Sequence, residues 1–101
     1  MRFLVKISFA TEAGNNAAKQ GFSMIPAILE EQKTEAVYFH AENGLRTCTM
    51  IVNMESASDL PRIAEPWFLA LNATVDAYPA MLPEDLQKAA PDIQAAVEKY
   101  G

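Results

Sequence analysis

Cysteine, histidine and tryptophan each occur only once in this chain of 101 residues. Cys48 has no partner for an intrachain disulfide, and the chain has no cluster of cysteines able to hold a metal ion. The single histidine, His40, and the dispersed acidic residues form no recognisable metal motif, so we expect no metal and no cofactor. An unpaired cysteine is typical of a reducing compartment, which predicts a cytoplasmic protein.

Positive charge is also scarce, because 8 lysines and arginines stand against 13 aspartates and glutamates, for a net charge of −5. The basic residues are scattered, whereas nucleic acids and anionic membranes attract clustered ones. The uncharged stretch from Pro66 to Val75 is far shorter than the ~18 residues of a spanning helix. Lys6 and Glu12 interrupt the apolar N-terminus and make it a poor signal peptide. We expect neither a nucleic acid nor a membrane as a partner.

The length of the chain predicts a single domain over residues 1–101. Half of the residues are hydrophobic, and a domain of this size buries roughly 60–65% of its unfolded surface. That is enough for one core but leaves little apolar surface for a deep internal pocket. A sizeable cavity is therefore expected to need a second subunit.

Four segments show the alternation of apolar and polar residues that is typical of a half-buried strand. They are residues 2–9, 35–42, 45–54 and 73–80. Asn43 and Gly44 separate the second segment from the third, and this pair favours the positive φ angles of a two-residue hairpin turn. The turn sets the pairing of the two strands and places His40 opposite Thr47.

Two short helices are predicted between the first two strands. The first is capped by Thr11 and runs to about Gln20, and Gly21 interrupts the helical pattern. The second is capped by Ser23 and runs to about Gln32.

Prolines mark the two helices that follow the hairpin. Ser58 or Asp59 is expected to cap the first of them, and Pro66 is expected to kink it. Pro83 opens a C-terminal helix, in which Pro91 is a candidate point of division.

The element order is strand, helix, strand, strand, helix, strand, with a C-terminal helix added. This is the split β-α-β pattern of a ferredoxin-like α+β fold, in which the helices cover one face of an antiparallel sheet. The covered face is expected to hold Phe3, Val5, Ile7, Phe9, Val37, Phe39, Cys48, Met50, Val52, Val75 and Ala77. Burial on that face is expected to raise the pKa of the Cys48 thiol and leave it unreactive.

The opposite, open face is mixed in character. It is expected to hold Leu4, Lys6, Ser8, Tyr38, His40, Thr47, Thr49, Ile51, Asn53, Thr74, Asp76 and Tyr78. A solvated face normally carries more lysine and glutamate, and a dry core carries fewer ionisable groups. The intermediate character suits a surface that closes on a second sheet around a small, partly polar cavity.

The element order, with the lone Trp67 after Glu65 and Pro66, resembles the dimeric α+β barrel superfamily. Its members include muconolactone-isomerase-like, stress-responsive barrel and antibiotic-monooxygenase-like proteins and many uncharacterised bacterial proteins. The resemblance implies that two sheets pair through their open faces. It also implies that ligands lie between sheet and helices or inside the barrel.

The resemblance implies residue types for a site but no activity, because one fold serves many functions. The monooxygenase-like members surround an aromatic substrate with Asn, Trp and an aromatic residue or His. Asn53, Trp67, Tyr38 and His40 are of these types. Haem-degrading relatives ligate iron through a histidine on a helix, whereas His40 is predicted on a strand, which argues against haem.

His40 and Asp76 are the candidate catalytic residues. Histidine ordinarily changes its charge near neutral pH, and Asp76 is the acid within the strands of the open face that could orient its ring. The two residues belong to opposite edge strands, roughly 14 Å apart at the usual strand spacing, so their contact requires a second subunit. An inert histidine near the end of the hairpin is the alternative.

Five further residues are candidates for ligand binding: Lys6, Tyr38, Asn53, Trp67 and Tyr78. The tyrosines combine a flat apolar ring with a polar tip, which suits a subunit interface as well as a pocket. Lys6 neighbours Asp76 across adjacent strands, where an ordinary ion pair is the alternative. For Trp67 the alternative is packing in the core.

Three functions are compatible with these features. The first is a small soluble homodimer that pairs through its open sheet faces and binds a small molecule in or beside the barrel. The second is a cofactor-independent enzyme of the isomerase or monooxygenase type. It would act on a small aromatic or carbonyl compound, with His40 as base and Tyr38, Tyr78 or Asn53 holding a developing oxyanion. The third is a structural interaction module without a ligand.

Overall fold

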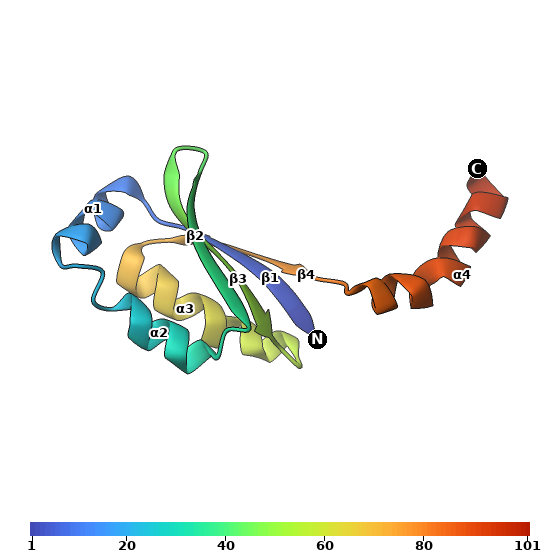
Figure 1. The fold of residues 1–101 in the computed structure, drawn as a ribbon, viewed down its shortest axis with the longest axis horizontal. Coiled ribbons are helices and arrows are strands. Elements are labelled where there is room, and N and C mark those ends of the chain that lie inside the picture. The colour runs from blue at the N-terminus through green and yellow to red at the C-terminus, as the bar shows by residue number, and fades with distance from the viewer.

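Four antiparallel strands form the sheet of the computed structural model, which describes residues 1–101 (Figure 1). The strands are β1 (Arg2–Ser8), β2 (Ala36–Glu42), β3 (Leu45–Asn53) and β4 (Thr74–Pro79). Their order in the sheet is β2-β3-β1-β4, so β1 and β3 are central and β2 and β4 are the edges. The alternation in the sequence therefore located all four strands, with each end correct to about one residue.

The hairpin between β2 and β3 has the predicted register. Asn43 and Gly44 both have positive φ angles, of 54° and 76°. His40 pairs with Thr47, as the two-residue turn requires. Since side chains alternate between the faces of a strand, this register also decides which residues share a face.

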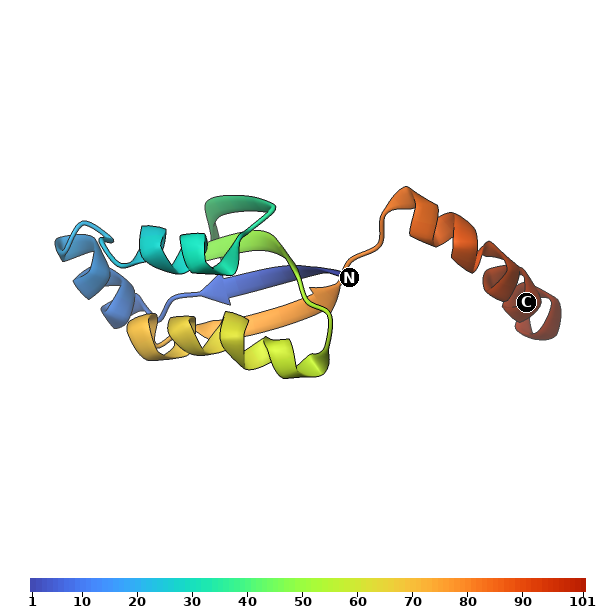
Figure 2. The same cartoon turned by 90° about the horizontal axis from the view of Figure 1, so that it is seen from below.

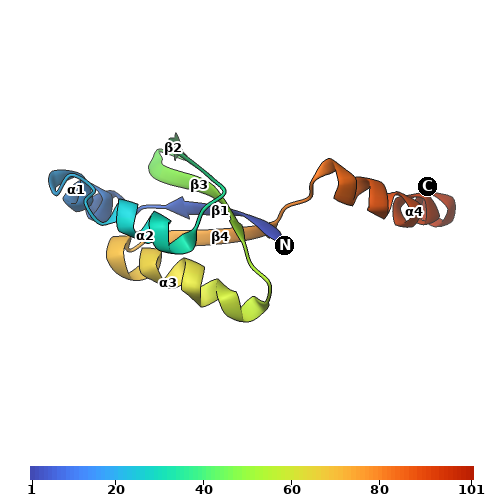
Figure 3. The same ribbon diagram turned by 60° about the horizontal axis from the view of Figure 1, so that its bottom comes forward.

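Three helices pack with the sheet, two of them on one of its faces and the first past the end of the strands (Figures 2 and 3). They are α1 (Thr11–Lys19), α2 (Ile25–Gln32) and α3 (Leu60–Leu71), and a short 3₁₀ turn, η1 (Ala57–Asp59), precedes α3. A fourth helix, α4 (Pro83–Tyr100), ends the chain. The order of elements is thus β-α-α-β-β-α-β-α, an α+β fold in which two helices connect β1 to β2. None of the helices has the length and apolar character needed to cross a bilayer.

The predicted caps of α1 and α2 are wrong, although the break at Gly21 is correct. The N-cap residues are Ala10 and Met24, and neither makes a side-chain capping bond. The second helix begins later than Ser23 implies because Gly21 and Phe22 both adopt positive φ angles and carry the chain through an extra turn.

Asp59 occupies the N-cap position of α3, as predicted, but its side chain completes the capping box of the preceding 3₁₀ turn, whose N-cap is Ser56. Its carboxylate accepts hydrogen bonds from the backbone N–H groups of Glu55 (2.9 Å) and Ser56 (3.3 Å). These two bonds favour the charged carboxylate and hold the pKa of Asp59 below its ordinary value. The group therefore stabilises the fold above its unfolded-state pKa, and this contribution is lost as the pH falls through the lower folded-state value.

We expect Asp59→Asn to destabilise the protein at neutral pH. The difference is expected to shrink as the pH falls below the ordinary aspartate pKa and through the lower folded-state value, where the wild-type carboxylate becomes protonated. Urea unfolding of both proteins at about pH 6 and at about pH 2.5 measures this difference. An equal gap in unfolding free energy at the two pH values would show that the Asp59 charge contributes nothing.

Trp67 lies at the centre of the core between the sheet and the helices. Its side chain is fully buried and stacks on Phe9 with the ring centroids 6.2 Å apart. The indole N–H donates to Gln32 Oε1 (3.0 Å), and Gln32 Nε2 donates to the Ile63 carbonyl oxygen (2.8 Å). Gln32 thereby joins α2 to α3 and leaves no polar atom of this group unpaired.

Helix α4 extends away from the rest of the molecule (Figures 1 and 2). None of its residues is buried, although Leu86, Ile93, Val97 and Tyr100 recur along one side at helical spacing. The radius of gyration is consequently 16.9 Å, against about 13 Å for a globular chain of this length. Pro91 lies within α4, which continues through it.

Candidate functional site

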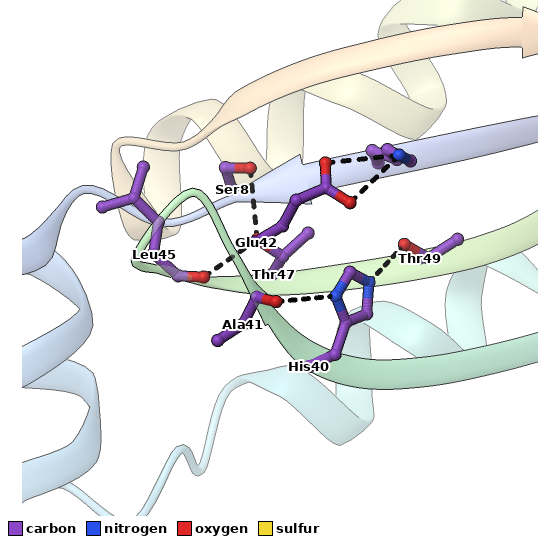
Figure 4. A network of polar contacts seen from close by, with 8 residues as sticks. Ser8, His40, Ala41, Glu42, Leu45, Thr47 and Thr49 are labelled. Atoms are coloured by element: carbon purple, nitrogen blue, oxygen red, sulfur yellow. Dashed lines mark hydrogen bonds and ion pairs between the residues drawn. The ribbon is translucent and has the colours of Figure 1, made fainter.

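The open face of the sheet carries a network of polar side chains (Figure 4). Ser8 Oγ and Thr47 Oγ1 lie 3.3 Å apart, and Thr47 Oγ1 also donates to the Leu45 carbonyl oxygen (3.0 Å). His40 Nε2 and Thr49 Oγ1 share a hydrogen bond of 2.6 Å. The network runs over β1, β3 and β2, and it exists because alternate positions of these strands carry hydroxyl, imidazole and charged groups.

Lys6 pairs with Glu42 and not with Asp76. The backbone register does place Lys6 opposite Asp76, as expected. The lysine side chain instead reaches over β3, so that its Nζ lies 3.1 Å and 3.2 Å from the two carboxylate oxygens of Glu42. The pair is partly exposed to solvent, so it contributes about 1 kcal/mol or less to stability.

Glu42 is a member of this network that the sequence analysis did not single out. The signal was available, since Glu42 is two residues from His40 and therefore shares its face of β2. The partner of Lys6 was not foreseeable in the same way, because it depends on the reach of a long side chain across an intervening strand.

The structure does not bring the two candidate catalytic residues together. His40 is on β2 and Asp76 on β4, so β3 and β1 separate them, at roughly 14 Å. The ring of His40 has Thr49 as its partner, with a long contact of 3.4 Å between Nδ1 and the Ala41 carbonyl oxygen. No carboxylate orients this imidazole within one protomer.

The five candidate ligand-binding residues fall into three places. Lys6, Tyr38 and Tyr78 lie on the open face, where the two tyrosines are 70% and 52% exposed. Asn53 lies at the end of β3 and accepts a hydrogen bond from the N-terminal amino group of Met1 (2.6 Å). Trp67 lies in the core on the other side of the sheet, with its indole N–H already bonded to Gln32.

Cys48 is fully buried on the helix-covered face. Burial disfavours the thiolate and raises the pKa of Cys48 to about 11. The thiol is therefore almost entirely protonated at neutral pH and is not a nucleophile, as expected from its position in the sequence.

Phe39 was expected among the buried residues of the covered face, but it is 55% exposed. The helices leave this end of β2 uncovered, and a hollow of about 530 Å³ opens beside it. Phe9, Phe22 and Arg46 also line this hollow. No sequence pattern indicated this hollow, because it forms between the α1–α2 turn and the β2–β3 hairpin, which are distant in the sequence.

Comparison with known proteins places the chain in a family without identifying a function. No curated protein matches it. Residues 1–94 match the family described as "Domain of unknown function (DUF3303)". The matched region includes the whole sheet, α1 to α3 and most of α4, and therefore every residue of the open face. The chain belongs to the DUF3303 family.

Proposed function

We propose that the protein is a cytoplasmic homodimer in which two open sheet faces pair around a small-molecule ligand, as in the dimeric α+β barrels. The observation that carries this proposal is the open face itself. It presents exposed Tyr38 and Tyr78 on either side of an ordered polar network, and no element of the chain covers it. Such a face is suited to a partner, because its tyrosines offer apolar area and its network offers hydrogen bonds.

The strand order supports the barrel architecture. The order β2-β3-β1-β4, with helices on one face only, supports a ferredoxin-like sheet, although two helices rather than one connect β1 to β2. A two-fold axis through the open face would pair identical surfaces, which is the commonest form of homodimer.

Helix α4 can enlarge the interface between the two protomers beyond the area of the sheet faces. The outline of the sheet face measures only roughly 20 Å by 20 Å, whereas a stable interface buries about 800 Å² of accessible surface on each partner. Sheet pairing alone therefore makes a small interface. We propose that the apolar side of α4, which is uncovered in its own protomer, packs on the second copy and provides the rest.

The chemistry of the open face suits a small, partly polar ligand. Tyr38 and Tyr78 offer flat apolar walls, and Lys6 and His40 offer a cation and an imidazole on the same surface. A small aromatic or carbonyl compound matches this combination, with its ring against a tyrosine and its polar group on the network.

Ligand binding fits the open face better than catalysis or a purely structural role does. A cofactor-independent enzyme would use His40 as a base, but Asp76 is on the opposite edge of the sheet and orients nothing in the same protomer. A structural module would need no polar network at the centre of its interface, where unpaired polar groups are costly.

The open face is tested by the double variant Tyr38→Glu and Tyr78→Glu. Placing a charge at two positions of an interface is expected to weaken self-association by roughly 30-fold or more for each substitution. Sedimentation velocity over a concentration series measures the effect, and circular dichroism checks the fold.

The matched control is Leu69→Glu, which introduces a charge at an exposed apolar residue of α3, on the helix side of the sheet. It is expected to sediment like the wild type. If the tyrosine variant also sediments like the wild type, the open face is not the dimer interface.

A further inference from the structure

A second candidate binding site lies at the hairpin end of the sheet, where Phe9, Phe39 and Arg46 of the covered face line it together with His40 and Thr47 of the polar network. The hollow beside Phe39 has a volume of about 530 Å³ and lies between the β2–β3 hairpin and the turn from α1 to α2. Its size is in the range of about 300–1,000 Å³ that is typical of small-molecule pockets. Residues of a single protomer form it, so it does not depend on the proposed dimer.

Three of the nine residues that line the hollow are phenylalanines. Phe9 lines the hollow and also stacks on the ring of Trp67 in the core. Phe22 and Phe39 line the hollow from the helical side and from β2. Phe39 is 55% exposed, whereas Cys48, its partner in the register, is fully buried. An aromatic ring left open beside a hollow offers a stacking surface for a flat ligand.

The backbone at Phe22 is held in an unusual conformation. The N–H groups of Gly21 and Phe22 bond to the carbonyl oxygens of Ala18 and Ala17, a Schellman motif that accounts for the positive φ of Gly21. That motif does not require the φ of 54° at Phe22 itself. Positive φ is rare for a bulky residue and tends to occur at ligand-binding positions. Here it directs the chain so that Phe22 lines the hollow.

Arg46 supplies the only positive charge among the lining residues apart from any charge on His40. Its Nη1 donates to Asn15 Oδ1 (2.9 Å), a neutral acceptor. Gly14 makes room for it, since a Cβ at that position would lie 3.0 Å from Nη1. The ion pairs of the molecule are Arg2–Glu35 and Lys6–Glu42, so Arg46 is held in place without a carboxylate.

Six of the eight lysines and arginines make no ion pair. Among these, Arg46 lines the aromatic hollow and is fixed there by its hydrogen bond to Asn15. Its planar group matches a carboxylate, which it binds through two parallel hydrogen bonds. We infer that the hollow binds an aromatic carboxylate, with the ring against Phe39 and Phe22 and the carboxylate on Arg46. This site uses Arg46 and the phenylalanines rather than the tyrosines of the open face, although His40 and Thr47 of the polar network also line it.

The test compares 2-naphthoate with its neutral analogue 2-naphthamide by isothermal titration calorimetry. The carboxylate is expected to bind at least tenfold more tightly than the amide, because a hydrogen-bonded charge pair forms only with the former. Arg46→Gln is expected to abolish this preference, and Arg46→Lys to retain part of it. Phe39→Ala is expected to weaken both ligands, since it removes an exposed ring and leaves the buried core unchanged.

Two controls separate this inference from the dimer proposal. Arg62→Gln changes another exposed arginine, on α3, and is expected to leave both affinities unchanged. The Tyr38→Glu and Tyr78→Glu variant is expected to keep the binding of 2-naphthoate that depends on Arg46, whatever its oligomeric state. On titration with 2-naphthoate, the NMR chemical shifts of the backbone amides of Phe22, Phe39 and Arg46 are expected to change. The inference is overturned if neither compound binds, if both bind equally, or if the shifts map to the open face.

Discussion

Replacing Ile93 and Val97 with glutamate is expected to separate the dimer into protomers without unfolding the sheet. The two side chains lie on the apolar side of α4 and are 50% and 54% exposed. They contact no core, so the substitutions remove nothing that a single protomer needs. In a dimer they would be buried, and two unpaired carboxylates in an apolar interface are expected to weaken association by roughly 100-fold or more.

The matched control puts the same change in net charge on the opposite side of the helix. Lys88→Gln with Ala95→Glu does this, because these positions lie about half a turn away from Ile93 and Val97. Sedimentation velocity is expected to show that the control is a dimer and that the Ile93→Glu and Val97→Glu variant is a monomer.

Two results would contradict this role of α4. If both variants dimerise equally, the helix makes no contact with the second copy. If the apolar-side variant instead unfolds more readily than the control, then α4 packs on its own protomer. Urea unfolding at low protein concentration distinguishes this second outcome, because only contacts within a protomer persist there.

Gln32→Leu is expected to lower the free energy of unfolding by about 3 kcal/mol, since it leaves two buried polar groups without partners. The Trp67 indole N–H loses its acceptor, and the Ile63 carbonyl oxygen loses its donor. The variant keeps a side chain of similar size, so a cavity contributes little. Urea unfolding measures the change.

A double-mutant cycle with Trp67→Phe isolates the hydrogen bond to the indole. The cost of Gln32→Leu is expected to be smaller in the Trp67→Phe background, because no indole N–H remains to be left unpaired. Gln87→Ala is the control, as Gln87 is exposed on α4. A loss below about 0.5 kcal/mol for Gln32→Leu would show that water replaces these bonds and that the group is not a structural link.

The sheet was predictable from the sequence because its signals are local. Alternation of apolar and polar residues located the four strands, and Asn43-Gly44 set the register of the hairpin. The same periodicity placed His40 and the tyrosines on the open face. Each of these features depends on residues close together in the chain and on the two-residue repeat of a strand.

The features that sequence reasoning missed depend on distances between elements. Lys6 bonds to Glu42 across β3, a choice that the length of its side chain decides. Phe39 is exposed because the helices stop short of it, although it does lie on the covered face. A glutamine at a helix end is expected on the surface, yet Gln32 is buried between α2 and α3. No local pattern records how far one element extends over another.

Native mass spectrometry of the protein as isolated tests the central claim most directly, because it reports subunit number and bound small molecules together. We predict a species of twice the protomer mass that carries an additional small mass, released on activation in the gas phase. A species of the protomer mass at micromolar concentration, with nothing bound, would contradict both the pairing of the open faces and the ligand between them.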